Sequence, residues 1–294
     1  MSLPLIQELI FGVVLGSYVA LGAIGFTLVY GLVNMINFAH GEFITIGAYV
    51  GFLVVAVLGV PLPVAVLVAF VVTAVAGWAL AQVAFEPLDE AGAVPLLLMS
   101  IGLGLVLRNG IRLVAGADPR YVDFPSETFR FDGLGFFVTT QQLFIVGITL
   151  AAVVVLHLFL NRTMLGIAMR ATSDDADLAR VTGIDTYRIR SVVWLAASGL
   201  AGIAGVLLAV AQAARPVTGF EQVLLLITAA ILGGAGSPYG AVAGSYLLGI
   251  GIAVSIAFLP TSASAFGSTM AFVVLILVLL VRPGGLVNQE VRSA

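Results

Sequence analysis

The chain has 294 residues, of which 61% are hydrophobic and 9% charged, and its formal net charge is −3. Because a soluble domain carries roughly 25% charged residues, this composition excludes a water-soluble fold, and the slight negative charge provides no basic surface for nucleic acid. The sequence has no cysteine, which excludes disulfides and thiolate metal sites, and its twelve cationic residues are all arginine, which excludes a Walker A phosphate loop with its lysine.

Apolar runs long enough to cross a membrane follow one another along the sequence. A bilayer core of about 30 Å needs about 20 residues of α-helix, and the runs lie at 9–30, 43–59, 62–84, 94–114, 141–160, 191–212, 222–235, 239–259 and 267–281. The run at 222–235 is short and could be a half-span, so the sequence predicts eight or nine transmembrane helices. We therefore expect an all-α polytopic membrane protein with Gly-rich interrupted segments, in which residues 1–294 form a single transmembrane domain.

Four polar residues interrupt the apolar sequence in the segment GLVNMINFAHGEFITIGAY, residues 31–49. Polar groups at membrane depth are costly and tend to line pathways, and an unwound segment between half-spans is one way to build a transport site. A structural role is the alternative, because Glu42 would suit a helix N-terminus and Asn37 would suit a cap or turn. We expect the segment to lie near a translocation path and to have no catalytic role; its polar residues are Asn34, Asn37, His40 and Glu42.

Arginines predict the orientation of the chain in the membrane. Five of the twelve lie in the loop 162–190, between two apolar runs, and arginine is retained on the cytoplasmic side during insertion. The C-terminal tail, with two further arginines, is expected on the same side. An even number of spans must therefore separate the loop from the tail, and this favours a crossing by the run 222–235. Counting back places the segment 115–140 and the N-terminus outside the cell, and the acidic segment 86–92 inside.

The loop 162–190 also contains the start and stop signals of a short helix. Thr172 and Asp175 have the spacing of a capping box, and the first turn is acidic. An arginine in the last turn and a following glycine complete the pattern. These signals predict a helix at about 173–181, which is either a solvated connector or a helix that docks on a partner protein. Its acidic residues are Asp174, Asp175 and Asp177, its arginine is Arg180, its stop is Gly183, and its outward apolar anchor is Leu178 or Val181.

Glycines break the apolar sequence again in the segment Ile231–Gly249, where Gly233, Gly234, Gly236 and Pro238 cannot all lie comfortably in a helix. This segment is either a plain tight turn between helices or a second interrupted span that faces the first across a pathway.

Elsewhere in the sequence small residues recur at a spacing of four, which allows helix backbones to approach closely in lipid. Such pairs are Gly12/Gly16, Gly47/Gly51, Ser198/Gly202, Ala201/Gly205 and Gly240/Gly244.

Two arginines near the predicted outer end of the fourth run, Arg108 and Arg112, are expected to snorkel to water. The sequence contains no HExxH motif, no nucleophile elbow and no cluster of histidines and carboxylates at metal-ligand spacing. We therefore expect neither an enzyme nor a metal site.

Three stretches of the sequence resemble the LivH-type permease subunits of branched-chain amino acid ABC importers. They are NFAHGEFITIGAYV near the start, RATSDDADLARVTGID in the middle and LGGAGSPYGAVAG near the end, and the resemblance extends over nearly the whole chain. The stretch DLARVTG resembles the EAA-type permease motif, in which Ala179 and Gly183 would frame a coupling helix and Asp177 stands where that motif has glutamate. The resemblance implies an ATPase-coupling loop formed by Asp174, Asp175, Asp177, Leu178, Ala179, Arg180 and Gly183.

The resemblance also implies a function and a set of partners. A second permease chain, usually a different one, would complete the pore, two ATPase subunits would use ATP, and an extracytoplasmic binding protein would deliver the substrate. This chain would bind no cofactor itself and would lie in the plasma membrane of a bacterium or archaeon. The implied substrates are branched-chain or other small amino acids, and a urea or short-chain amide importer is the alternative within the same permease type.

Two rival functions come from other classes of membrane protein. A passive aquaporin-like channel would carry a pair of Asn-Pro-Ala motifs, and this sequence has none. An ion-coupled secondary transporter usually needs carboxylates in the middle of its spans, and the sequence suggests none there.

Overall fold

The computed structural model describes residues 5–131, 133, 135–258 and the isolated positions 269, 273, 276, 280 and 286. Helices make up most of this part of the chain. The long helices are α1 (Leu5–Val33), α2 (His40–Phe52), α3 (Leu62–Leu80), α4 (Ala93–Ala115), α5 (Thr140–Arg162), α8 (Thr186–Ala211), α9 (Thr218–Gly233) and α10 (Pro238–Phe258). The short helices are α6 (Met164–Asp174) and α7 (Ala176–Val181), and one hairpin pairs β1 (Thr128–Phe131) with β2 (Phe136–Thr139).

Seven helices of the described residues are long and apolar enough to cross a membrane, counting the π-helical and 3-10 turns that extend α2 and α3. The polytopic all-α prediction is therefore confirmed, with the small hairpin as an addition that the sequence did not indicate. Helix α9 has only 16 residues, as the short run 222–235 suggested. The predicted span 267–281 lies almost entirely outside the described residues, so the total of eight or nine remains a prediction.

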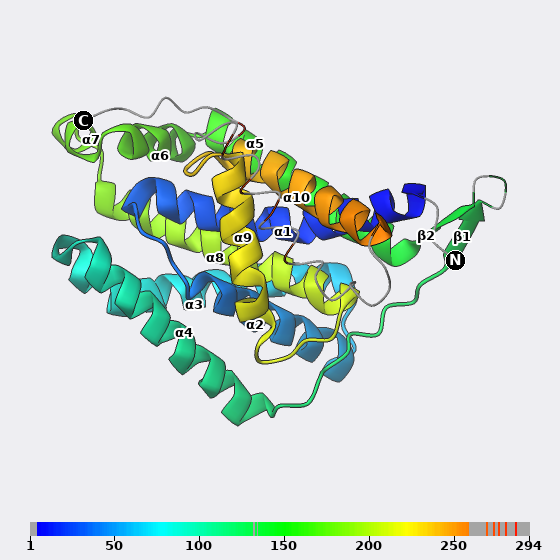
Figure 1. Cartoon of the computed structure of the whole chain (residues 1–294). Coiled ribbons are helices and arrows are strands. Elements are labelled where there is room, and N and C mark those ends of the chain that lie inside the picture. The colour runs from blue at the N-terminus through cyan, green and yellow to red at the C-terminus, as the bar shows by residue number, and fades with distance from the viewer. Residues whose placement is uncertain are drawn as a thin grey trace.

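The hairpin and the N-terminal end of α1 lie at one end of the bundle, and α6 and α7 lie at the other (Figure 1). At the first end, the Phe137 backbone N–H donates to Gln7 Oε1 at 2.9 Å. At the second, Arg190 of α8 pairs with Glu86 after α3 at 3.2 Å. This grouping matches the two sets of segments that the arginine distribution placed on opposite sides of the membrane.

Close crossings of small residues hold the long helices together. A Cβ atom built on Gly12 of α1 would lie 2.7 Å from Ile250 Cα of α10, and one on Gly47 of α2 would lie 2.5 Å from Gly202 Cα of α8. Neither helix pair could approach so closely with a side chain at these positions. The prediction that the small residues spaced four apart serve helix packing is confirmed at these positions.

Candidate functional site

The segment predicted to dock on a partner forms two helices rather than one. Helix α6 continues to Asp174, and a new helix, α7, begins at Ala176, so the predicted helix at 173–181 is wrong in its first half. The break falls at Asp175, whose backbone is extended and whose carboxylate accepts from the Leu178 N–H at 2.9 Å. The proposed capping box with Thr172 does not form, because the Thr172 hydroxyl donates to the Ala168 carbonyl inside α6 at 2.8 Å.

Helix α7 nevertheless has the end and the outer face that its sequence predicted. Gly183 adopts φ +91°, and the Ile184 N–H donates to the Ala179 carbonyl at 3.0 Å, which closes the helix. Ala179 is buried against the rest of the chain, whereas Leu178 is 61% exposed and Val181 is 85% exposed. The helix therefore presents two apolar side chains outward.

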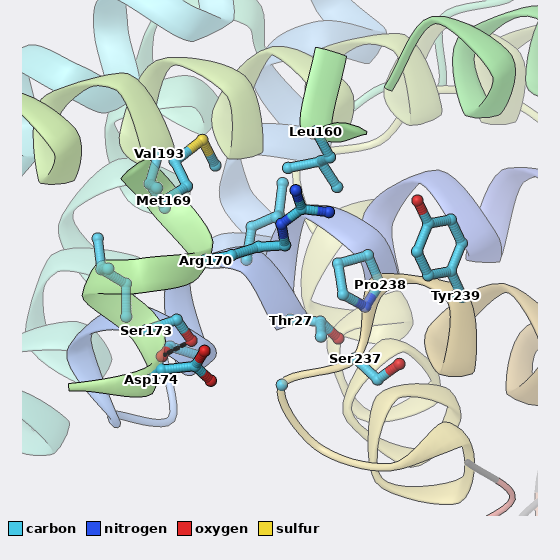
Figure 2. Close-up of a pocket in the computed structure, with 14 residues that line it drawn as sticks. Thr27, Leu160, Met169, Arg170, Ser173, Asp174, Val193, Ser237, Pro238 and Tyr239 are labelled. Atoms are coloured by element: carbon cyan, nitrogen blue, oxygen red, sulfur yellow. Dashed lines mark hydrogen bonds between the residues drawn. The ribbon is translucent and has the colours of Figure 1, made fainter. Parts of the chain in front are cut away.

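A cavity of about 230 Å³ lies beneath α6, between it, the end of α1 and the turn that leads into α10 (Figure 2). Ser173 of α6 donates from its hydroxyl to the Gly31 carbonyl of α1 at 2.7 Å, beside this cavity. Arg170 of α6 donates to Asn161 Oδ1 at 2.5 Å, and Asn161 Nδ2 donates to the Tyr239 hydroxyl of α10 at 2.6 Å. Hydrogen bonds thus connect α6 to α1, to α5 and, through Asn161, to α10.

Helix α2 begins in the middle of the bundle rather than at its end. His40, its first residue, lies with Nε2 3.0 Å from the Gly22 carbonyl of α1. Gly22 lies eleven residues before Val33, the last residue of α1, which at 1.5 Å per residue is about 16 Å. This is about half the thickness of a bilayer core of about 30 Å, so the chain after α1 turns back into the membrane before α2 begins.

Helix α9 begins at the same depth, against the start of α2. A Cβ atom on Gly41 would meet the Gly219 backbone, and one on Gly219 would meet Gly41. The Gly219 N–H donates to the Thr45 hydroxyl at 2.9 Å. The second interrupted region is therefore the segment 212–217, which the sequence did not indicate.

The glycine-rich segment that was a candidate for the second interruption forms a tight turn instead. Gly233 and Gly240 have their backbones in contact, and Gly234 and Gly236 adopt positive φ between α9 and α10. A Cβ atom on Gly31 would lie 3.5 Å from Gly236 Cα, so this turn lies at the end of α1. Helix α9 consequently runs from the middle of the bundle to the end where α6 and α7 lie.

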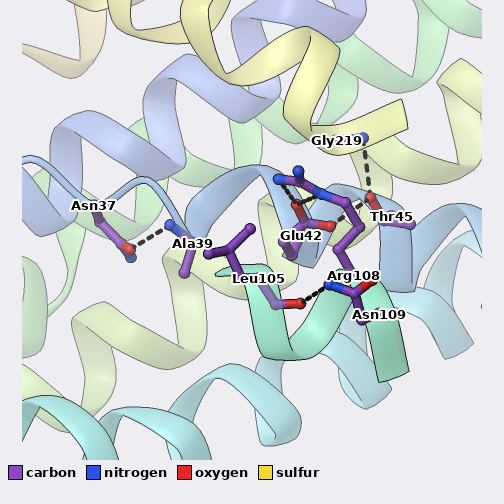
Figure 3. A network of polar contacts seen from close by, with 8 residues as sticks. All are labelled: Asn37, Ala39, Glu42, Thr45, Leu105, Arg108, Asn109 and Gly219. Carbon is purple, nitrogen blue, oxygen red and sulfur yellow. Dashed lines mark hydrogen bonds and ion pairs between the residues drawn. The ribbon is translucent and has the colours of Figure 1, made fainter. Parts of the chain in front are cut away.

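An ion pair joins α2 to α4 where the two interrupted helices begin (Figure 3). Arg108 donates from Nε at 3.0 Å and from Nη2 at 2.8 Å, both to Oε1 of Glu42. The Thr45 hydroxyl donates to the other carboxylate oxygen, Oε2, at 3.3 Å. The Arg108 guanidinium also lies 4.0 Å from the centre of the Phe220 ring of α9. Arg108 therefore does not snorkel to water as predicted, because a buried carboxylate on the neighbouring helix attracts it.

The other polar residues of the segment 31–49 face different ways. Asn34 is exposed and adopts φ 53°, which turns the chain back after α1. Asn37 is buried: its Oδ1 accepts from the Ala39 N–H at 3.0 Å, and its Nδ2 has no partner among the described residues. His40 is fully buried between the rings of Phe26 and Phe43. The structure thus places Asn37 and Glu42 beside α4, and turns His40 inward to α1.

The face of the chain around this ion pair is open. Helix α4 is the least buried of the seven described spans: 17% of its most apolar stretch is buried within the chain, against 83% for α8. Ile36, Leu105, Phe220 and Leu224 are all exposed near the starts of α2 and α9 or on α4. Within the described residues no group of three histidines or carboxylates could hold a metal ion. The ion pair and the exposed apolar side chains beside it can bind a solute by charge and by apolar contact.

Comparison with known proteins gives concordant matches over nearly the whole chain. A family model described as the permease component of a branched-chain amino acid transport system matches residues 9–280. The high-affinity branched-chain amino acid transport system permease protein LivH of Escherichia coli K12 is 36% identical, over 97% of this chain and 96% of its own length. The corresponding protein BraD of Pseudomonas aeruginosa is 34% identical over the same shares. The probable LivH permease of Methanocaldococcus jannaschii is 30% identical, over 95% of this chain and 91% of its own length.

A solved structure shares the fold. A chain of PsaBC from Streptococcus pneumoniae, determined in complex with a Fab, superimposes with a TM-score of 0.50 over 95% of this chain and 91% of that chain. The two sequences are 16% identical, so this similarity concerns the architecture alone.

Proposed function

The chain belongs to the family of branched-chain amino acid transport permeases, and we propose that it carries branched-chain amino acids across the plasma membrane. As a member of this family it is a multi-pass permease subunit of an ABC importer. The observation that carries the substrate assignment is the match to proteins named for that substrate over 97% of the chain. No observation favours the urea or amide alternative.

The translocation path, in this proposal, follows the open face where α2 and α9 begin. Asn34, Asn37 and Glu42 border it, and His40 anchors the start of α2 against α1. The buried, unpartnered Nδ2 of Asn37 and the ion pair of Glu42 support this position, because polar groups at membrane depth are retained where they serve transport. Arg108 of α4 joins these residues, although the sequence alone did not indicate it.

A second permease chain covers this face and completes the path. The weak burial of α4 supports such a partner, since a helix in a finished bundle packs more of its surface against neighbours. We further propose that residues 1–294 form one transmembrane permease domain, that the loop 162–190 is cytoplasmic, and that an extracytoplasmic binding protein delivers substrate at the hairpin end.

Two ATPase subunits supply the energy and use the ATP, and this chain binds no cofactor. Helix α7 docks on one of them through Leu178 and Val181, and Arg180 lies at the rim of that contact. The hydrogen bonds of α6 to Gly31 and Asn161 then carry its movement to α1 and α5. Because α1 ends two residues after Gly31 and Asn34 follows directly, a shift of α6 reaches the path through a short stretch of chain.

Reconstituted transport tests the proposed function. Proteoliposomes that contain this chain, its partner permease and the ATPase subunits, supplied with the binding protein, are expected to accumulate L-leucine only when ATP is present. Vesicles with this chain as the sole protein are expected to accumulate none, because it has no phosphate loop. ATP-dependent uptake by the chain alone, or no leucine uptake by the complete complex, would contradict the proposal.

A further inference from the structure

The Glu42–Arg108 ion pair is accessible from one side only. The Glu42 side chain is 1% exposed and the Arg108 side chain is 19% exposed, so the carboxylate is buried and part of the guanidinium is open. Arg108 uses Nε and Nη2 on a single carboxylate oxygen, and the described residues give its Nη1 no hydrogen bond. The exposed ring of Phe220 lies beside the guanidinium, 4.0 Å from it. A solute on the open face would therefore meet Arg108 and Phe220 first.

Helix α4 is held to α2 and to the segment just before it by few polar contacts. Besides the ion pair, the Phe38 N–H donates to Ser100 Oγ of α4 at 3.2 Å. Only Leu96, Ser100 and Gly104 of α4 are buried. A small displacement of α4 would thus separate Arg108 from Glu42 without disrupting the core, which lies around α1 and α8.

We propose that the zwitterionic head of an α-amino acid replaces this ion pair as the substrate passes. The substrate carboxylate binds Arg108, its ammonium binds Glu42, and its apolar side chain lies against Phe220 and the exposed apolar residues beside it. This inference rests on the proposed function. Arginine suits this role because its planar guanidinium can bind a carboxylate through two parallel hydrogen bonds.

The exchange selects zwitterions for an electrostatic reason. Separating two charges in a low-dielectric site leaves each one uncompensated, and this is strongly unfavourable. A zwitterion supplies both opposite charges at once, whereas an uncharged amide supplies neither and a simple cation or anion supplies only one. A solute that lacks one of the two charges would leave Glu42 or Arg108 unpaired, so the closed ion pair excludes it. Specificity then comes from the unfavourable binding of the wrong solute.

The test compares two ion-paired groups of the same chain in the complete reconstituted complex. One variant neutralises the site with Glu42→Gln and Arg108→Gln together, since a single substitution would leave a buried charge unpaired. The matched control neutralises Arg190 together with its two carboxylate partners, as Arg190→Gln, Glu86→Gln and Asp89→Asn, because this group lies at the end of the bundle near α6 and α7. The measurement is the number of L-leucine molecules accumulated per ATP hydrolysed, with saturating leucine-loaded binding protein.

We expect the Glu42/Arg108 variant to assemble and to lose leucine transport per ATP by about tenfold or more, since two charge contacts to the substrate are removed. The Glu86/Asp89/Arg190 control is expected to keep the wild-type ratio. If the glutamine pair does not assemble, Glu42→Leu with Arg108→Met is measured instead, because apolar replacement of a buried ion pair is often neutral for stability.

A wild-type ratio in an assembled Glu42/Arg108 variant would overturn the inference and leave the pair as a link between helices. Equal losses in the variant and the control would overturn it as well. Failure of the wild-type complex to accumulate leucine would instead count against the proposed function, so the two failures are distinct.

Discussion

Replacing Gly47 with leucine is expected to abolish the folded permease. Gly47 of α2 crosses Gly202 of α8, and a Cβ atom there would lie 2.5 Å from Gly202 Cα and closer still to its carbonyl oxygen. Backbone atoms cannot rotate away as a side chain can, so the two helices must separate along their shared face. Overpacking of this kind costs about 3 kcal/mol or more, and separation would also move the start of α2 away from α9.

The measurement is the amount of monodisperse complex recovered in detergent, followed by its thermal unfolding midpoint. Gly147→Leu in α5 is the matched control, because a Cβ atom there would meet no atom within 4 Å in the part of the chain that the structure describes. We expect near wild-type recovery for Gly147→Leu and little or none for Gly47→Leu. Equal recovery of the two variants would show that α2 and α8 do not pack as described.

Disrupting α7 is expected to abolish ATP hydrolysis stimulated by the loaded binding protein. Leu178→Asp places a charge on the outward apolar face, and a charge in an apolar contact is costly. Gly183→Val forces a β-branched residue into φ +91°, which disfavours the turn that ends the helix. Both variants are expected to reach the membrane and bind the loaded receptor, and to lose stimulated hydrolysis by about tenfold or more if the contact is a helix-in-groove contact.

Gly59→Val provides the control for the effect of strain alone. Gly59 also adopts positive φ, at +68°, and no atom of the described residues lies within 4 Å of a Cβ built there. It lies in the turn between α2 and α3, away from α7. Stimulation is expected to survive in Gly59→Val. Wild-type stimulation in both Leu178→Asp and Gly183→Val would show that the loop 162–190 is only a connector.

Hydrophobic run length and arginine distribution predicted the long helices of the described chain and which segments share an end of the bundle. The runs 62–84, 94–114 and 141–160 correspond closely to α3, α4 and α5, because each crosses the bilayer as an uninterrupted helix. The prediction that the segment 86–92 and the loop 162–190 share one end agrees with the contact of Glu86 with Arg190. Which end faces the cytoplasm remains a prediction.

Interactions between distant residues could not be predicted in the same way. Glu42 and Arg108 are 66 residues apart in sequence, and nothing local distinguishes a paired arginine near a helix end from one that reaches water. The composition of a helix also does not determine the depth in the membrane at which the helix begins. By sequence α2 and α9 resemble short spans, yet both start in the middle of the bundle. The one available signal was the length of the run 222–235, too short to cross by itself.

The division between α6 and α7 shows the limit of capping signals. Thr172, Asp174 and Asp175 lie within four residues of one another and are all common helix-capping residue types, and the sequence alone does not decide which of them caps. The threonine hydroxyl bonds within α6, and Asp175 caps the following helix. Choosing the first possible cap therefore placed the start of the helix three residues too early.

Water access to the junction of α2 and α9 tests the central claim most directly. Because the chain contains no cysteine, single cysteines at two exposed positions report the junction alone: Ile36, shortly before α2, and Phe220, beside Arg108. Val181→Cys serves as the reference for the cytoplasmic side and Ser126→Cys for the outer side. The assembled complex would be labelled with a membrane-impermeant maleimide from each side, with and without a non-hydrolysable ATP analogue.

We expect both junction cysteines to be labelled. The side from which they react is expected to change when the analogue binds, as it would in a path that opens alternately to either side. Labelling is expected to depend on the second permease chain, which separates this face from lipid. No labelling in either state, while the two reference cysteines react from their own sides, would place the junction in lipid and contradict the account.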